Sequence, residues 1–249
     1  LAQLADAVTV DGSNVGIGTT PSSNLHVKNS NGGIVQTIET SDSGNAYTKY
    51  INSTTGSGQF TDGLLVGLDT DESATFWNFE NTHMKFGTAN TERMRIDASG
   101  RVTMPYQPAF HAGLSTNTSS LTSGSTLIFN SVYENRGNHY NTSTGVFTAP
   151  VTGFYSFTTR ILHQGVSNGH AVDSQMAKNN SSSSGNAFLM QRHKYQADYT
   201  GHTGYLSEGT SGMVYLAAGD NFRVKYGGSQ NSVIHGNPSW TYFCGHLVS

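Results

Sequence analysis

Apolar and polar side chains alternate along much of this chain. In "FRVKY", a period of two places Phe222, Val224 and Tyr226 inward, and Arg223 and Lys225 outward. Successive side chains of a strand point to opposite faces of its sheet, so this alternation is typical of a β-strand with one buried face. We therefore expect sheets with one face turned to a core.

The same alternation recurs in short segments that clusters of Gly, Asn, Ser and Asp separate. "GFYSFTTRI" places Tyr155, Phe157, Thr159 and Ile161 on one side. Helical periodicity is confined to the opening "LAQLADAV", which is too short to be stable alone. The pattern predicts an all-β protein.

The chain has two parts that differ in sequence pattern, and we place the boundary between them after residue 104, so that the parts are residues 1–104 and 105–249. "MPYQP", with Pro105 and Pro108, is typical of an extended hinge between them. Within the first part, "VTVDGSNVGIG" is echoed by "MRIDASGRVTM". Two copies are too few for a solenoid, so they predict two similar β-turn units on either side of an insert.

Composition narrows the class of protein. Charged residues make up 12% and the formal net charge is -3, which argues against nucleic-acid binding because that needs a basic surface. No apolar run approaches the roughly 18 residues of a membrane span, so no membrane insertion is expected. The chain starts at Leu1 rather than Met, and we expect an upstream segment that would attach it to other proteins.

From residue 108 onward the chain resembles the globular head of complement component one-q, a jelly roll of the tumour-necrosis-factor type. The resemblance rests on "PAFHAGL", "TLIFNSVYENRGNHYNTSTGVFTAPVTGFYSF", "MAKNN", "MVYLAAGDNFRVKY" and "WTYFCGHLV", which occur in family order and spacing. It implies a two-sheet sandwich, a homotrimer, and a framework of core residues: Phe110, Tyr140, Phe147, Tyr155, Phe157, Val224 and Phe243. The turn residues Asn135, Gly137 and Gly145 also fall on family positions.

The first part resembles bacteriophage tail-fibre proteins. "NVGIGTTPSSNLHV" and "TERMRIDASGRV", with "DGLLVGLDTDESATFWNFEN" between them, carry this resemblance. It implies a trimeric, β-rich shaft that precedes a terminal domain. The expected fold is thus a shaft over 1–104 followed by a jelly-roll head over 105–249.

The aromatic strands of the head carry large residues on both faces, as in "GFYSF" and "TYFCG". A single sandwich whose sheets each have one solvent-exposed face would not require large residues on both faces. A second buried face therefore implies a neighbouring copy. Both this pattern and the family resemblance favour a homotrimer.

Candidate catalytic and metal sites are weak. The acidic run Asp69, Asp71 and Glu72 could be a carboxylate pair for glycan hydrolysis, but a solvated turn is the favoured interpretation. The ten histidines, His163, His170, His193 and His202 among them, lack ligand spacing. A metal on a three-fold axis is possible but unsupported, so no catalytic residue, metal or cofactor is assigned. Cys244 is expected to be an inert thiol.

Aromatic and polar side chains mixed in loops suit recognition of carbohydrate or protein surfaces. The long segment "RHKYQADYTGHTGY" has this mixture, and "HGNPSWTY" adds Trp240 and Tyr242, although Trp240 is expected in the core because it adjoins the last strand. The receptor-binding residues are therefore expected to be Arg192, His193, Tyr195, Tyr199, His202 and Tyr205.

These observations together indicate a non-enzymatic virion protein, the distal part of a trimeric phage tail fibre, exposed on the virion. Its head would bind a host-surface glycan or protein at three equivalent sites. Three alternatives stay open: a capsid head fibre or decoration protein, a polysaccharide depolymerase, and a bacterial adhesin.

Overall fold

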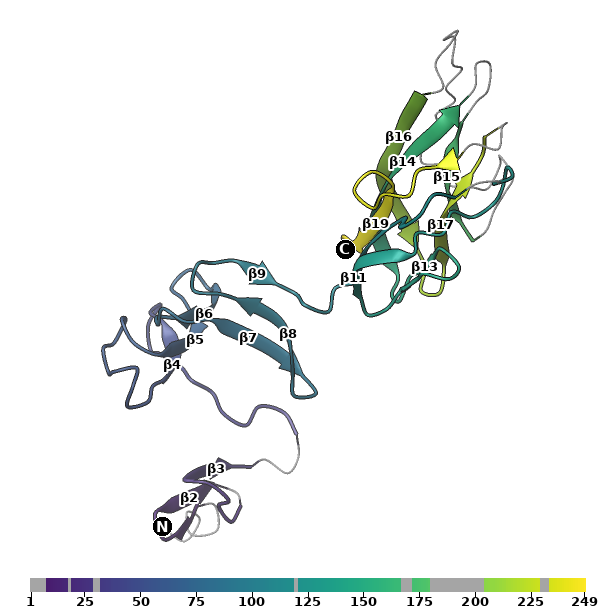
Figure 1. Cartoon of the computed structure of the whole chain (residues 1–249). Coiled ribbons are helices and arrows are strands. Elements are labelled where there is room, and N and C mark those ends of the chain that lie inside the picture. Colours follow the sequence, from purple (N-terminus) through teal and green to yellow (C-terminus); the bar gives the residue numbers. More distant parts are fainter. Residues whose placement is uncertain are drawn as a thin grey trace. The chain divides into compact units, whose positions relative to one another are not determined.

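The computed structural model describes residues 8–17, 19–28, 32–118, 121–166, 172–179, 204–228 and 233–249. Strands and connecting turns make up these ranges, which contain no helix and hence no helix that could cross a membrane (Figure 1). The all-β prediction is confirmed for the described residues. The chain divides into two compact units, Leu1–Thr103 and Met104–Ser249.

The first unit contains three small sheets of three strands each. The first sheet pairs β1 (Val8–Asp11) with β2 (Asn14–Ile17), and β3 (Leu25–Val27) runs parallel to β2. The second is antiparallel and contains β4 (Ala46–Tyr50), β5 (Leu64–Leu68) and β6 (Ala74–Asn78). The third, also antiparallel, contains β7 (Met84–Thr88), β8 (Thr91–Ile96) and β9 (Val102–Thr103).

The two echoed segments are both hairpin turns. Gly12 lies at the turn between β1 and β2, and Gly100 lies at the turn between β8 and β9; both have positive φ, of 62° and 79°. At the second turn, the Asp97 carboxylate accepts hydrogen bonds from the backbone of Ser99 and Arg101 and from the Arg101 side chain. These bonds hold the pKa of Asp97 below its ordinary value. The prediction of two similar turn units is therefore correct.

The first unit has almost no core of its own. Among its described residues, Leu65 is the one large hydrophobic side chain that is buried. Large apolar side chains are instead exposed in all three sheets, including Leu25, Phe76, Trp77 and Phe86. Phe76 and Trp77 are neighbours on β6, so they point to opposite faces of one sheet, and both faces are apolar and uncovered.

The second unit is a sandwich of two sheets. The larger sheet has the order β11-β10-β19-β14-β16, with β18 also paired to β14, and the smaller has the order β12-β13-β17-β15. Neighbouring strands are mostly distant in sequence, which is the topology of a jelly roll. The bounds are β10 (Ala109–Gly113), β11 (Ser131–Arg136), β12 (Tyr140–Asn141), β13 (Val146–Thr148), β14 (Gly153–Val166), β15 (Ser174–Lys178), β16 (Gly204–Leu216), β17 (Asn221–Tyr226), β18 (Val233–Ile234) and β19 (Tyr242–Leu247).

Aromatic rings from both sheets fill the space between them. Phe157 of the larger sheet stacks on Phe222 of the smaller one, with ring centroids 4.2 Å apart, and Phe110 stacks on Phe147 at 5.2 Å. The seven residues expected as framework all lie in this one buried cluster: Phe110, Tyr140, Phe147, Tyr155, Phe157, Val224 and Phe243. The alternation in "GFYSFTTRI" thus marks the core-facing side of β14.

The inward and outward positions predicted from "FRVKY" are correct except at Lys225. Phe222, Val224 and Tyr226 are buried as expected, but Lys225 is also buried, with 6% of its surface exposed. Backbone groups of the connecting segment at Ser125 and Leu127 hydrogen-bond with β17, so this strand is enclosed by more than its sheet neighbours. Burial, with the charge of Arg223, lowers the pKa of Lys225.

Candidate functional site: the outward face of the six-stranded sheet

The larger sheet turns one face to the core and the other outward, and the outward face carries the candidate site. On β14 and β16, every second residue points away from the core, because side chains alternate along a strand. Phe154 and Tyr215 face each other across the two strands, with ring centroids 5.3 Å apart. Together with Met213 they form an exposed apolar patch, which we call the C-terminal patch because Phe154 pairs with the final residues of the chain.

A polar hollow lies farther along the same face. It has a volume of about 390 Å³, and its lining includes Thr158, Arg160, Ser207, Ser211 and Tyr242. The Arg160 guanidinium donates a hydrogen bond from Nε to the Ser207 hydroxyl at 3.1 Å. Within the described part of the chain, no carboxylate forms an ion pair with Arg160. Arg160 therefore presents donors to whatever occupies the hollow.

Three aromatic rings, from β16 and from the segment between β18 and β19, pack against one another, and we call them the Trp240 cluster. Tyr205 packs edge-on against His235 at 5.4 Å between ring centroids, and His235 stacks on Trp240 at 6.0 Å. Tyr205 is 59% exposed and Trp240 is 47% exposed. The expectation that Trp240 is a core residue is therefore wrong. Residues 235–241 leave the sheet between β18 and β19, so proximity to the last strand did not bring the indole into the core.

Backbone hydrogen bonds fix the turn that carries Trp240. The Asn237 carbonyl accepts from the backbone N–H groups of Trp240 and Thr241, and the Asn237 side chain accepts from the N–H of Ser239. The N–H of His235 donates to the carbonyl of Leu162 on β14 at 2.8 Å. The backbone that carries the rings of His235 and Trp240 is consequently held by hydrogen bonds.

A hydrogen-bonded pair of a histidine and a glutamate is buried on the core side of the same two strands. His163 Nε2 lies 2.8 Å from Glu208 Oε1, and the two side chains are 0% and 1% exposed. The ring of Tyr226, on the opposite sheet, lies 6.1 Å from the His163 ring. This histidine, considered above as a possible metal ligand, is thus bonded to a carboxylate inside the sandwich.

Of the residues expected to bind a receptor, one can be placed. Tyr205 belongs to the Trp240 cluster, whereas Arg192, His193, Tyr195, Tyr199 and His202 lie outside the described residues. His170 also lies outside them. Sequence reasoning missed Arg160 and His235. His235 is the first residue of the motif "HGNPSWTY", so its closeness to Trp240 in the sequence was the signal that could have identified it. For Arg160, the sequence offered no signal beyond its position in a strand.

The acidic run forms the turn between β5 and β6. The backbone N–H of Glu72 donates to the Asp69 carbonyl, and the Asp71 carboxylate accepts from the backbone and hydroxyl of Ser73. These bonds, chiefly that from the Ser73 hydroxyl, lower the pKa of Asp71. A general acid needs a raised pKa, so the arrangement matches the solvated turn rather than a hydrolytic pair.

The described residues support neither a metal site nor a reactive cysteine. No group of three or more His, Cys, Asp or Glu side chains in the described ranges could hold a metal ion. Cys244 is half-buried, and burial raises the pKa of its thiol, which opposes formation of the reactive thiolate.

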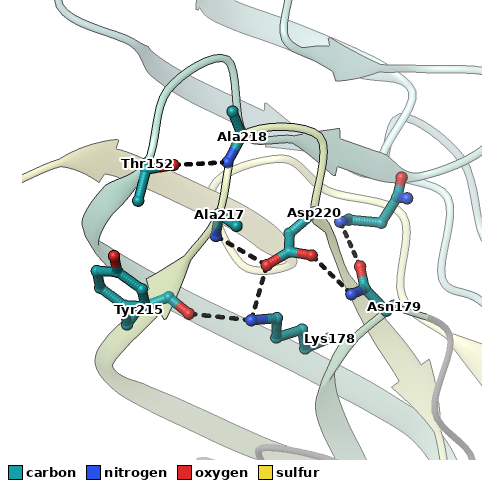
Figure 2. A network of polar contacts seen from close by, with 8 residues as sticks. Thr152, Lys178, Asn179, Tyr215, Ala217, Ala218 and Asp220 are labelled. Carbon is teal, nitrogen blue, oxygen red and sulfur yellow. Dashed lines mark hydrogen bonds and ion pairs between the residues drawn. The ribbon is translucent and has the colours of Figure 1, made fainter.

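A polar network closes the end of the sandwich near the C-terminal patch (Figure 2). The Asp220 carboxylate accepts from Lys178 Nζ at 2.7 Å, from the Asn179 amide at 2.7 Å and from the backbone N–H of Ala217 at 2.8 Å. The Asn179 amide oxygen in turn accepts from the N–H of Asn221. The network joins the end of β15 to the turn between β16 and β17, so its role is to hold the strand ends together.

Similarity to known proteins was found for this unit. The C1q domain family matches residues 109–248. Among solved structures, the globular domain of zebrafish complement 1qA is 18% identical, covering 57% of this chain and 98% of that one with a TM-score of 0.42. Eiger TNF from S. frugiperda is 13% identical over 57% of this chain and 93% of that one, with a TM-score of 0.43. Murine APRIL is 16% identical over 57% and 99%, with a TM-score of 0.43. The family match spans more than half of the chain, and the chain belongs to the C1q domain family.

Proposed function

We propose that this chain is the distal part of a homotrimeric bacteriophage tail fibre, exposed on the virion, whose head binds the surface of the host cell. The first unit serves as the shaft and the second unit as the receptor-binding tip. Proteins with C1q domains bind ligands, often as trimers, and are not enzymes, which agrees with a binding role.

The observation that carries this proposal is the missing core of the first unit. Its described residues bury one large hydrophobic side chain, Leu65, while aromatic residues such as Phe76 and Trp77 stay exposed on both faces of a sheet. Apolar surface of this extent is unfavourable in water and marks a contact with another chain. Identical neighbouring chains would supply that cover, as a trimeric shaft requires.

The head supplies a second surface for the same assembly. The C-terminal patch exposes 46% of Phe154, 61% of Met213 and 51% of Tyr215 on one sheet face. Placed between copies, these side chains would be the second buried face that the two-sided aromatic pattern predicts. The phage-fibre resemblance of the first unit supports a virion context for this assembly.

Three equivalent tips would bind a cell surface multivalently. Linked weak sites can raise the overall affinity by about 10²–10⁴ over a single site. Such a mechanism needs contact surfaces rather than a reacting group, and the upstream side would attach the fibre to other virion proteins.

Mass measurement and adsorption test the proposal. Light scattering of the full chain is expected to give three times the monomer mass of 26.6 kDa. Excess purified protein is expected to adsorb to host bacteria and to block phage adsorption. A monomeric mass would contradict the assembly, and unchanged phage adsorption would contradict the receptor role. Immunogold labelling of virions is expected at the tail, and labelling of the capsid would contradict the location.

A further inference from the structure

We propose that the head binds the end of an alkyl chain in an apolar cavity between its two sheets. The cavity has a volume of about 100 Å³. Its lining comes from the segment that connects β10 to β11, from β18 and from Thr241, which directly precedes β19. Binding of an alkyl chain there would not depend on the receptor role proposed for the head.

The connecting segment between β10 and β11 links the two sheets. It starts and ends in the larger sheet, and midway Thr126 forms a bridge with Lys225 of β17 in the smaller sheet. Four residues of the lining belong to the buried core cluster: Leu114, Leu127, Phe129 and Ile234. The cavity is therefore part of the space between the sheets, rather than of the outward face of the larger sheet.

Backbone polar groups of the lining are bonded within the protein. Thr118 and Ile234 exchange two backbone hydrogen bonds, of 3.0 and 2.8 Å, and the N–H of Leu127 donates to the Val224 carbonyl at 2.9 Å. The hydroxyl of Thr241 accepts from the N–H of Leu162 at 3.2 Å. A buried water needs about two to four polar partners, which these walls do not supply. The cavity therefore favours a hydrocarbon group over water.

The same bonds keep the walls in place. On one side the connecting segment also contacts the turn between β12 and β13, where Gly145 has a φ of 70° and a Cβ atom would lie 2.4 Å from the Leu127 carbonyl oxygen. Walls fixed in this way relax little around an empty space, so the lining loses packing contacts that a ligand would restore.

The size of the cavity selects the kind of hydrocarbon. Its volume of about 100 Å³ is smaller than the roughly 150 Å³ of an engineered cavity that holds benzene. A narrow, flexible group fits such a space better than a ring does. The end of a straight alkyl chain is a group of this kind.

The lining reaches the surface at Ile128. This side chain is 42% exposed, and Leu121 and Thr126 beside the cavity are half-buried, whereas Leu127 is only 4% exposed. A chain that enters past Ile128 would bury its methyl end and leave its polar end in water. The ligand is therefore an amphiphile with a single alkyl chain in the cavity, either free in solution or part of a lipid.

Methyl NMR of the full-chain trimer, labelled at Ile, Leu and Val methyl groups, tests the site. The probes are 1-butanol, 1-pentanol and 1-hexanol. The Leu127 and Ile234 signals are expected to shift saturably, while those of Leu65 in the first unit stay unchanged. Affinity should rise by about fourfold for each added methylene until the cavity is full. Sodium octanoate and phosphatidylcholine vesicles, added separately, distinguish a free amphiphile from a membrane lipid as the source of the chain.

Two substitutions should remove binding in different ways. Leu127→Phe fills the cavity, and Ile128→Trp covers its entrance; each is expected to weaken binding of 1-hexanol by about tenfold or more, because the buried contact is lost. Val151→Trp is the matched control. Val151 is 45% exposed, lies between β13 and β14 and is not part of the lining, so its replacement should leave the affinity unchanged.

Three outcomes would overturn the proposal. Absence of a saturable shift at Leu127 and Ile234 with all three alcohols would show that the cavity takes no alkyl chain. Equal affinity of the Ile128→Trp and Val151→Trp variants would place the alcohol elsewhere. Binding by Leu127→Phe with the affinity of the parent would do the same. If Leu127→Phe does not fold, Ile128→Trp decides alone, since Ile128 is exposed and its replacement does not disturb the core.

Discussion

At the scale of single residues, His163 and Glu208 show how strongly burial constrains ionisable groups. Each is essentially without solvent contact, and one 2.8 Å hydrogen bond joins them. The second carboxylate oxygen of Glu208 has no hydrogen-bond partner in the described part of the structure. Removing one member of a buried pair leaves the other group desolvated and uncompensated, whereas removing both does not.

Single and double replacements at this pair should therefore differ. Glu208→Ala and His163→Ala are each expected to lower the free energy of unfolding by about 3–5 kcal/mol. The double variant His163→Ala, Glu208→Ala should lose clearly less than the sum of the two single losses, because neither polar group is then left without its partner. Urea unfolding measures all three, and strictly additive losses would contradict the pairing.

Asp220 gives a prediction on pH. Lys178 and Asn179 lower its pKa from the ordinary 3.8 to about 2. A carboxyl whose folded pKa is depressed adds stability above its unfolded pKa and loses it as the pH falls through the folded value. The contribution should thus be complete above about pH 5 and disappear between about pH 4 and pH 2.

The Asp220→Asn variant isolates this contribution. It should be less stable than the parent at pH 7 by about 1–3 kcal/mol, since charge-assisted hydrogen bonds are lost, and the difference should shrink toward pH 2. Urea midpoints of both proteins across this range provide the measurement. Glu134→Gln is the control, because its partner Arg136 and the carboxylate itself are about half exposed. A stability difference between the Asp220→Asn variant and the parent that stays constant with pH would contradict this role of the Asp220 carboxylate.

At the scale of elements, a glycine allows aromatic rings to pack closely against β19 in the larger sheet. Gly245 lies between β10 and β14, opposite Phe110 and Phe157. A Cβ atom at this position would lie 2.3 Å from the Phe157 ring and 3.1 Å from the Phe110 ring. The small residue thus allows both rings to pack against the strand.

Gly245→Ala should consequently destabilise the head by about 1–3 kcal/mol through overpacking. His246→Ala, one residue away on the exposed face, should change stability by less than about 0.5 kcal/mol. Thermal unfolding of the two variants beside the parent tests this. Equal melting temperatures would show that the rings shift without cost.

At the scale of the whole molecule, the two units differ in how they satisfy their apolar surface. The second unit buries a continuous aromatic core, and the first exposes most of its large apolar side chains. A unit without a core depends on its neighbours for stability. The assembly state of the head should therefore control the integrity of the first unit.

Met213→Glu tests this dependence by placing a charge in the C-terminal patch. We expect a monomeric mass by light scattering and rapid proteolysis within residues 1–103, while residues 104–249 stay resistant. Thr148→Glu puts the same charge on the exposed side of β13 in the smaller sheet, and it should remain trimeric and intact. A trimeric Met213→Glu protein would show that the patch is not the interface.

The predictions from sequence were most accurate where a repeating pattern reports a local environment. Alternation in β14 and β17 marked the core-facing side chains, and the Asp-containing motifs marked two hairpin turns. The position of Trp240 was wrong because it depends on where a connecting turn leaves the sheet, which no periodicity records. Burial of Lys225 was missed for the same reason, since a distant segment encloses its strand.

The sequence by itself thus determined the all-β class, because the period of a strand and the spacing of turn residues are local properties of the chain, and its resemblance to a known family identified the second unit and the residues of its core. Only the tertiary structure brought the rings of Tyr205, His235 and Trp240 together, and paired His163 with Glu208. Those contacts join strands that are distant in sequence, and packing between strands, rather than any pattern along one of them, sets which side chains meet.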